Sequence, residues 1–505
     1  MSKYHQKISH QEAVAIARSA FSTGRTKDVN FRLKQLRQLL RMYEENNDEI
    51  LLALKKDMRK SKLEGYLYEV ELMVNDVREA IRHLRTWTKP KWLRKNWLTF
   101  ADKGKIERVP FGVVLVIGPW NYPFQLTLVP LCGAIAAGNC VIVKPSEVSV
   151  HSAAKMAELI PKYLDPECYH VVMGGPTESE ELLKNKFDHI FFTGSIQVGR
   201  KIHQAAARHL TPVTLELGGK SPVYIDNTVD YAMAAQRIMW GKCMNMGQTC
   251  VAPDFIICTK EVEKAFIAEV KNAMQAWYGS DWKSKPDLAR IINAKHFNRL
   301  KSYLLNSGKV AVGGGYDEDD LWIEPSILVD VKVTDPIMQE EVFGPILPIV
   351  NMNSVVEAIK YINGRNSVPL CMYVFSADRG VQSLFENHVS AGTFACNETI
   401  VQFAIDELPF GGAGESGMGT YHGKFSFDAF SRDRACVYRD FSYLADKLGV
   451  FRYPPYSVLK INFLSFLLHH WKKFNITYFD YVPHLICFLL GIFAVFLYNN
   501  IHDDN

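Results

Sequence analysis

The chain has 505 residues, of which 48% are hydrophobic and 22% charged, and its formal net charge is +4. This length exceeds what one compact core usually fills, so we expect two or three domains. The small net charge, without a basic stripe interleaved with aromatic residues, argues against nucleic-acid binding. The ten cysteines form no Cys-x-x-Cys pair and no Cys/His cluster at zinc spacing, so we expect no metal site.

The beginning of the chain predicts a cytosolic context and a helical start. Residues 1–6 are polar and do not resemble a secretory signal, so reduced cysteines facing the cytosol are expected. Between Asn30 and Lys60, leucines recur among many charged residues. That spacing is typical of amphipathic helices.

From Val113 to Ile225, short β-branched runs alternate with helical stretches. The runs are 113–117, 141–143, 171–172, 190–192, 213–215 and 223–225, and the helical stretches include 153–163 and 198–208. Continuous apolar strands that alternate with helices indicate a parallel sheet covered on both faces. A second stretch of this kind follows residue 250, with a strand at 255–258 and a helix at 262–277. We therefore predict an α/β fold with two doubly wound lobes.

Residues 194–199 read Gly-Ser-Ile-Gln-Val-Gly, after a predicted strand and at the start of a predicted helix. Glycine there lets the backbone approach a phosphate, and a helix N-terminus favours negative charge. A plain strand-to-helix turn explains the same pattern. The Gly-x-Gly-x-x-Gly fingerprint is absent, which argues against an ordinary dinucleotide site.

Glu216 lies between two leucines, just before two glycines that permit close backbone approach. Partial burial would raise its pKa towards that of a useful general base. The alternative is a solvated glutamate at the end of a strand.

Cys250 lies within residues 247–254, which read Gly-Gln-Thr-Cys-Val-Ala-Pro-Asp. A cysteine held in such a bend can present its sulfur to a bound carbonyl. No Lys, Arg or His flanks it to activate the thiol. The alternative is a buried structural cysteine.

Several segments taken together resemble the aldehyde dehydrogenase superfamily, in particular its class 3 branch. These segments are 118–123, 144–147, 192–195, 215–222, 247–254, 340–345 and 409–412. The resemblance runs from about Val14 to Ser457. It implies two Rossmann-like lobes and a small β arm for oligomerisation. The implied domains are NAD-binding (1–90 and 112–217), catalytic (218–424), arm (91–111 and 425–445), linker with an amphipathic helix (446–480) and transmembrane anchor (481–499).

The resemblance implies NAD as the cofactor, with NADP as a weaker possibility because a carboxylate at the ribose disfavours a 2′-phosphate. Lys144 and Glu147 match the family's ligands of the adenosine ribose. Glu341 and Phe343 match its contacts on the nicotinamide side. The segment beside the pyrophosphate contributes Thr193, Gly194, Ser195 and Gly199.

The same resemblance assigns the chemistry. Cys250 is the expected nucleophile, and Asn121 with the Cys250 backbone N–H would stabilise the oxyanion. Glu216 would activate the water that hydrolyses the thioester, which favours water over coenzyme A as the acyl acceptor. The expected substrate-lining residues are Tyr122, Gln125, Trp240 and Met244, although each is also explained as core packing.

The C-terminal tail predicts a membrane anchor. Residues 482–498 are uncharged and mostly apolar, about the shortest length that spans a bilayer. Basic residues precede this segment, so we expect the catalytic body to face the cytosol. Ile461–Phe474 reads as an amphipathic helix. A buried or interfacial helix is the alternative for 482–498.

This layout resembles the membrane-bound fatty aldehyde dehydrogenases of the family, with a tail-anchored enzyme on the endoplasmic reticulum. The expected activity is NAD-dependent oxidation of medium- and long-chain aliphatic aldehydes to acids. We also expect a homodimer, formed through an arm strand at 435–438. The alternatives are a class 3 enzyme of short or aromatic aldehydes whose tail serves only targeting, a non-catalytic binding relative, and a cofactor-free thioester hydrolase.

Overall fold

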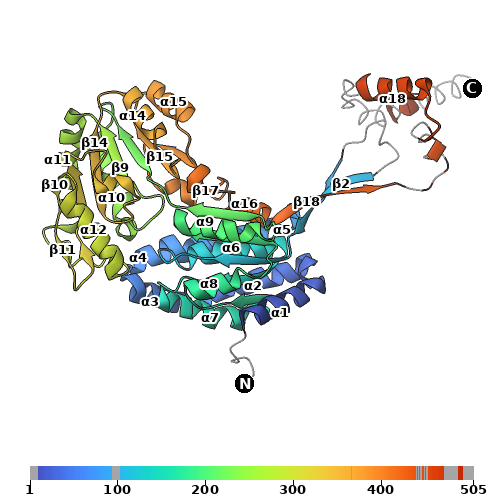
Figure 1. Cartoon of the computed structure of the whole chain (residues 1–505), viewed down its shortest axis with the longest axis horizontal. Helices are drawn as coiled ribbons and strands as arrows, with labels where there is room; N and C mark the ends of the chain where they lie inside the picture. Colours follow the sequence, from blue (N-terminus) through green and yellow to red (C-terminus); the bar gives the residue numbers. More distant parts are fainter. Residues whose placement is uncertain are drawn as a thin grey trace, which may run out of the picture. The chain divides into compact units, whose positions relative to one another are not determined.

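The computed structural model describes residues 9–93, 103–365, 367–439, 441, 443, 446–447, 450, 453–470 and 487–492. The chain divides into two compact units. The first consists of residues 1–88 and 109–432, and the second of 89–108 and 433–505. The first unit contains both large sheets and has the predicted α/β architecture (Figure 1).

The first sheet is parallel except at one edge. Its strand order is β17-β7-β6-β3-β4-β5, and β17 runs antiparallel to β7. The strands are β3 (Val113–Ile117), β4 (Cys140–Lys144), β5 (Tyr169–Val171), β6 (His189–Gly194), β7 (Val213–Leu217) and β17 (Gly417–Met418). β3 and β4 are buried along their whole length, which explains why they appear in the sequence as unbroken apolar runs. β5 ends one residue earlier than predicted.

Helices cover both faces of this sheet. The crossovers β3–α6–β4 and β6–α9–β7 run in opposite directions along the sheet, so their right-handedness places α6 and α9 on opposite faces. The predicted helices at 30–60 are confirmed as α2 and α3, which are separated at Asn46. The helices of this half are α1 (His10–Ser22), α2 (Val29–Glu45), α3 (Asn47–Met58), α4 (Lys62–Gly65), the π-helical η2 (Tyr66–Val70), α5 (Glu71–Trp87), α6 (Gln125–Ala137), α7 (Val150–Tyr163), α8 (Pro176–Leu182), α9 (Ile196–Ala207) and α16 (Gly423–Ala429).

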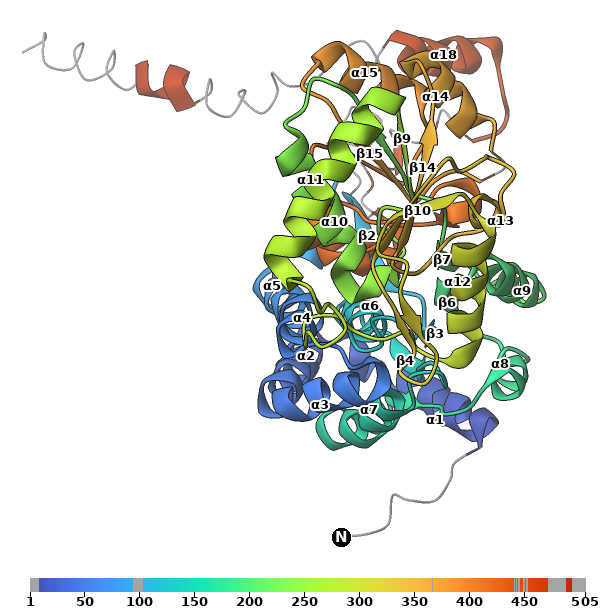
Figure 2. The ribbon, with the colours of Figure 1, turned by 90° about the vertical axis from the view of Figure 1, so that its left-hand side faces the viewer.

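The second sheet has the order β10-β13-β14-β9-β8-β15-β16, and β10 is antiparallel to β13. Helices α10 and α11 pack side by side next to it (Figure 2). The strands are β8 (Pro222–Ile225), β9 (Phe255–Cys258), β10 (Lys309–Val312), β13 (Ser326–Val329), β14 (Ile346–Asn351), β15 (Cys371–Phe375) and β16 (Thr393–Cys396). The helices are α10 (Tyr231–Cys243), η3 (Met244–Gly247), α11 (Lys260–Tyr278), α12 (Ala294–Asn306), α13 (Pro336–Gln339), α14 (Val355–Asn363), α15 (Arg379–His388), η4 (Val401–Ala404) and η5 (Gly414–Ser416).

Only four residues, 218–221, join the two sheets between β7 and β8. The carboxyl end of β7 therefore lies next to the amino end of β8. Because parallel strands share direction, this link brings the carboxyl edge of the first sheet to the amino edge of the second. Residues that leave β3, β4 and β6 at their carboxyl ends approach this same region.

The second unit contains a three-stranded sheet of order β1-β2-β18. Its strands are β1 (Lys91–Trp92), β2 (Lys103–Pro110) and β18 (Ser431–Tyr438). The Lys105 Nζ atom on β2 lies 5.4 Å from the ring centroid of Tyr438 on β18. The Arg434 guanidinium donates to Glu107 at 2.7 Å, which ties the same two strands together. The strand predicted at 435–438 is thus part of β18.

The tail differs from the expected amphipathic helix at 461–474. Helix α18 (Val458–His470) begins three residues earlier. Its apolar residues lie around the helix rather than along one face: at 100° per residue, Leu459 lies on the opposite side of the helix from Ile461 and Leu464. The predicted anchor, 481–499, lies outside the described residues except for 487–492. Within the part of the chain that the structure describes, no helix is both long and apolar enough to span a membrane.

Candidate active site

The link between β7 and β8 determines where Glu216 lies. Glu216 is in β7, next to Thr193 of β6 and Gly417 of β17 in the sheet register. Two residues further on, a Cβ atom on Gly218 would lie 2.1 Å from the Glu341 Oε2 atom. Only glycine lets this backbone pass so close to a carboxylate. The candidate general base and Glu341 are therefore held at one point between the sheets.

Cys250 lies in a turn after η3, where the backbone is unusual. Asn245 and Met246 both have left-handed backbone angles, at φ 49° and 53°. The buried Gln248 side chain holds this turn: its Nε2 donates to the carbonyls of Asn245 and Arg290, each at 3.0 Å, and its Oε1 accepts from the Ile292 N–H at 3.1 Å. The turn is fixed by hydrogen bonds to its backbone, so its geometry does not rely on the cysteine itself.

Tyr373 contacts the residue that follows Cys250 in this turn, which we call the nucleophile turn (residues 248–251). This tyrosine lies on β15 and is fully buried. Its hydroxyl donates to the Val251 carbonyl at 2.7 Å and accepts from Gln402 Nε2 at 3.1 Å. The residue after the nucleophile is thereby attached to β15 of the second sheet, the strand next to the β16 edge.

The Cys250 thiol is partly accessible but lies in surroundings that disfavour its charge. Burial raises its pKa, and the negative charges of Glu341 and Glu216 raise it further. Both effects favour the protonated thiol over the thiolate in the protein alone.

Glu216 is 3% exposed, and neither of its carboxyl oxygens has a hydrogen-bond partner among the described residues. Burial raises its pKa well above the ordinary value. A buried carboxyl without partners is costly to keep ionised, so burial favours its protonated form. Its partial burial was expected, and the structure buries it almost completely.

Asn121 follows β3 and faces the nucleophile turn. Its side-chain Nδ2 donates to the Gln248 carbonyl at 3.0 Å, two residues before Cys250. The adjacent Tyr122 hydroxyl lies 2.9 Å from Thr249 Oγ1. Two side chains from the 118–124 loop thus contact residues immediately before the cysteine. This arrangement leaves the second Nδ2 hydrogen of Asn121 for another acceptor.

The residues expected to hold a nucleotide lie where β4 and β6 end. Lys144 is buried, and its Nζ donates to Glu147 Oε2 at 3.2 Å, whereas the Glu147 side chain is 43% exposed. Thr193 Oγ1 is buried and has no partner within the described ranges. Ser195 is the N-cap of α9, so the segment 194–199 lies at the start of a helix as predicted.

Two glycines hold this edge together. A Cβ atom on Gly194 would lie 2.5 Å from the Phe192 ring, and one on Gly199 would lie 2.5 Å from Leu217 Cδ2. Gly199 thereby allows α9 to pack closely on β7. Both positions need a residue without a side chain for steric reasons alone.

Glu341 and Phe343 lie close to the crossing between the sheets, that is, the link formed by residues 218–221. Burial raises the pKa of Glu341 to about 8, with a further contribution from Asp254. Phe343 has a left-handed φ of 47°, which is uncommon outside glycine. Its ring meets Trp120 edge-on, with 5.4 Å between centroids. The contact joins this segment to the loop that carries Asn121.

The remaining expected lining residues occupy different environments. Trp240 is half-buried near the end of α10 and meets Tyr68 edge-on at 6.3 Å. Met244 is buried in η3. Gln125 is buried at the start of α6, and its Nε2 has no partner among the described residues. Of the four, Tyr122 has the most direct contact with the nucleophile turn.

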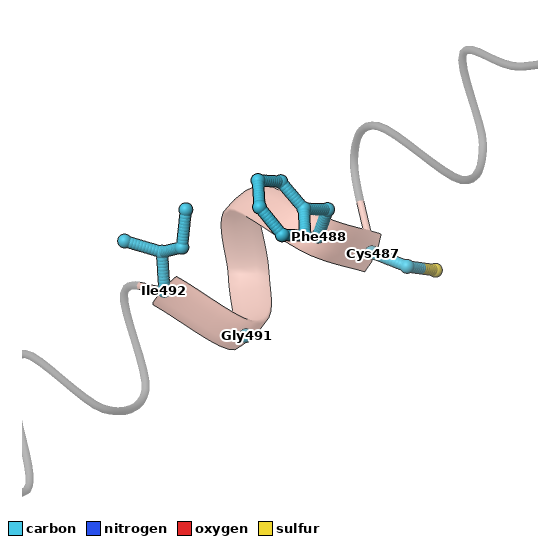
Figure 3. A pocket seen from close by; sticks show the side chains of 4 residues that line it. All are labelled: Cys487, Phe488, Gly491 and Ile492. Atoms are coloured by element: carbon cyan, nitrogen blue, oxygen red, sulfur yellow. The ribbon is translucent and has the colours of Figure 1, made fainter.

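Other concave or titratable places offer less chemistry. Residues Cys487, Phe488, Gly491 and Ile492 line a shallow hollow along a single helical turn (Figure 3). Its walls are apolar apart from the thiol. In the described part of the chain, no group of three or more His, Cys, Asp or Glu side chains is placed to hold a metal ion.

Comparison with known proteins identifies the family. The model named "Aldehyde dehydrogenase family" matches residues 3–436. The chain belongs to the aldehyde dehydrogenase family. It is 48% identical over 440 residues to cattle (Bos taurus) aldehyde dehydrogenase family 3 member B1, covering 87% of this chain and 93% of the relative. It is 47% identical over 458 residues to mouse (Mus musculus) family 3 member A2, covering 91% and 93%.

Solved structures agree with this family assignment. The substrate-bound Staphylococcus aureus AldH superposes with a TM-score of 0.87 at 40% identity, over 91% of this chain and 99% of that one. An aldehyde dehydrogenase from Sinorhizobium meliloti, described as NAD-dependent, gives a TM-score of 0.77 at 25% identity, covering 86% and 88%. The relatives confirm the predicted class 3 resemblance, and the solved structures confirm the predicted α/β aldehyde dehydrogenase fold.

The sequence analysis did not identify two buried charged residues near this site, Lys220 and Asp254. Lys220 forms a buried ion pair with Asp254, and its Nζ also donates to the carbonyls of Ile337 and Glu340 at 2.9 and 2.8 Å. Asp254 in turn accepts from the Val342 N–H at 2.8 Å. The pair connects the crossing, the nucleophile turn and the Glu341 segment. A signal existed, because both residues lie inside the motifs at 215–222 and 247–254.

The raised pKa of Cys250 predicts how the thiol reacts in the protein alone. The rate of its carboxamidomethylation by iodoacetamide should rise about tenfold per pH unit from pH ~7 to ~9, because only the thiolate reacts. Peptide mass spectrometry measures this rate, with Cys250→Ser as the control for the modified peptide. A plateau beginning below pH ~8 would indicate a low-pKa thiolate and contradict the account.

Proposed function

We propose that this enzyme oxidises medium- and long-chain aliphatic aldehydes to carboxylic acids with NAD, through a thioester on Cys250. The observation that carries the proposal is the buried carboxyl of Glu216, which has no hydrogen-bond partner among the described residues. A base without partners costs free energy in a folded protein and is best explained by a role in the reaction.

The first step is attack of the Cys250 sulfur on the aldehyde carbon. The thiol proton passes to a water molecule, the sulfur forms a C–S bond, and the C=O π electrons move to the carbonyl oxygen, which becomes negative. The Asn121 Nδ2 and the Cys250 backbone N–H donate hydrogen bonds to that oxygen. Loss of one such donor commonly costs a factor of about 10²–10³ in rate. Asn121 suits this role because Gln248 already orients its amide.

The residues at the carboxyl ends of β4 and β6 suit NAD. The strand order reverses between β3 and β6, and such a switch point is where doubly wound sheets bind nucleotides. Lys144 and the half-exposed Glu147 would hold the adenosine ribose, and the N-terminus of α9 would face the pyrophosphate. Bound NAD supplies the acceptor for the hydride that leaves the carbon attached to Cys250. The carboxylate of Glu147 repels a 2′-phosphate, which favours NAD over NADP.

The second half of the reaction is hydrolysis. Glu216, once ionised, takes a proton from water, the resulting hydroxide attacks the thioester carbon, and the C–S bond breaks. The acid leaves and the Cys250 thiol is restored. Glu216 is suited to this step because its raised pKa makes it a stronger base than an exposed glutamate.

The long-chain preference rests on apolar walls and on the tail. Tyr122, Trp240 and Met244 are aromatic or apolar, which suits an alkyl chain better than a sugar. The apolar segment 481–499 would tether the enzyme to the cytosolic face of the endoplasmic reticulum. Long-chain aldehydes partition into membranes, so a tether raises their local concentration. We also propose a homodimer through the sheet that contains β18.

The hydrolytic role of Glu216 predicts a trapped intermediate. Glu216→Gln should form one equivalent of NADH per site in a burst and then turn over about 10²–10⁴-fold more slowly than the wild type. Rapid-quench mass spectrometry should find the acyl group on the Cys250 peptide. Because burial raises the pKa of Glu216, hydrolysis by the wild type should accelerate as pH rises towards that pKa.

The matched control for this experiment is Glu263→Gln. Glu263 is buried on α11 and pairs with Lys260, so the change alters a buried glutamate outside the site. It should keep wild-type turnover. Full steady-state turnover in Glu216→Gln would remove this residue from the hydrolytic role.

The tail predicts a link between location and substrate. A protein that lacks residues 461–505 should leave the membrane fraction, and its activity on long saturated aldehydes should fall relative to short ones. Membrane flotation and NADH formation across a series of chain lengths measure the two effects. Continued membrane association would exclude the anchor. An unchanged chain-length profile would restrict the tail to targeting.

A further inference from the structure

The loop 118–124, which we call the oxyanion loop because it carries Asn121, is supported by a buried pair of charged residues. Neither residue takes part in the proposed reaction. Lys60 follows α3, and Glu69 lies in the π-helical turn η2. Their side chains are both 0% exposed, with 2.6 Å between Lys60 Nζ and Glu69 Oε1. Helix η2 packs against α6, at whose start the loop 118–124 ends. A π-helical segment inside a helical region often marks a functional place.

Lys60 contacts one end of this loop. Its Nζ donates to the Asn121 carbonyl at 3.1 Å and lies 4.0 Å from the centroid of the Tyr122 ring. With Glu69, these partners account for the three donors of the ammonium group. The charge is thus directed at the residue proposed to bind the oxyanion and at its neighbour.

Glu69 contacts the other end of the loop. Its Oε2 accepts from the backbone N–H groups of Phe124 and Gln125 at 3.0 and 3.3 Å. These groups begin α6, where a negative charge also interacts favourably with the helix dipole. The pair therefore grips residues 121–125 from both ends, and all but one of its contacts with the loop are to backbone atoms.

A further contact connects the clamp, by which we mean the Lys60–Glu69 pair, to the turn that holds Cys250. The Asn121 carbonyl also accepts from Asn245 Nδ2 at 3.0 Å, and Asn245 Nδ2 donates at 3.1 Å to the same Gln248 carbonyl that the Asn121 amide contacts. Any shift of the Asn121 backbone would move its amide relative to Cys250.

We propose that Lys60 and Glu69 are positioning residues that set the Asn121 amide for the oxyanion. The inference rests on the proposed role of Asn121. Burying two charges costs nearly as much as their attraction returns, so stability alone does not explain a fully buried pair. A role in holding the backbone of the oxyanion loop explains the pair, because a misplacement of the Asn121 amide by about 1 Å is enough to lower the rate by a large factor.

The test is a double-mutant cycle on the burst of NADH formation. Lys60→Met/Glu69→Gln removes both charges together, so neither is left buried without a partner. The burst rate of this variant should fall about 10- to 100-fold. In the Asn121→Ala background the same pair of changes should slow the burst less than about threefold, because residues that act through one group are not additive. Burst amplitude counts the folded sites in every sample.

The matched control is Asp57→Asn. Asp57 accepts from the backbone N–H groups of His151 and Ser152 at the start of α7, so it is a carboxylate at another helix N-terminus that does not touch the oxyanion loop. This variant should lose stability and keep the wild-type burst rate. A drop in burst rate as large as that of the clamp variant would assign both effects to general loosening and overturn the proposal.

The outcomes separate the two claims. Equal slowing in the wild-type and Asn121→Ala backgrounds would overturn the clamp and leave the proposed reaction intact. A wild-type burst rate in Lys60→Met/Glu69→Gln, with a lower unfolding temperature, would also overturn it and assign the pair a structural role. Asn121→Ala with a wild-type burst rate would contradict the oxyanion role and the clamp together.

Discussion

The short passage of the chain from β7 to β8 is the constraint on which the rest of the site depends. Four residues, 218–221, take the backbone from the carboxyl edge of one sheet to the amino edge of the other. Gly218 makes this possible beside Glu341, and Lys220 fixes the passage through its ion pair with Asp254. Each sheet then contributes the residues that leave its strands at this place. The first provides the ends of strands that suit a nucleotide, and the second provides the turn that holds Cys250.

The electrostatics of the site follow from its burial. Cys250, Glu216 and Glu341 all have raised pKa values because they lie in apolar surroundings near one another. At rest the site is therefore largely a set of neutral acids, which costs less than several unpaired charges in one small space. A positive charge that enters with a ligand favours their ionised forms. Burial thus favours the protonated, less reactive form of the Cys250 thiol in the protein alone.

The sequence predicted the strands and the family well, and it did not predict the buried charged residues that support the candidate site. Buried parallel strands such as 113–117 stand out because both faces need apolar residues. Lys60 and Glu69 resemble surface charges, since only the folded chain brings them to the backbone of a loop far away in the sequence. In the tail, by contrast, the sequence predicted a feature that the structure lacks. The amphipathic pattern expected at 461–474 is not present in α18. Long-range burial of charge has no local signature, and this is why it escaped prediction.

A structure of Glu216→Gln, trapped with NAD and a saturated aldehyde, tests the central claim most directly. The account predicts an acyl group bonded to Cys250 Sγ, with its oxygen about 3 Å from Asn121 Nδ2. The amide that replaces the Glu216 carboxyl should face the thioester carbon from within reach of one water molecule. An acyl group on another residue, or an acyl oxygen directed away from Asn121, would contradict the account.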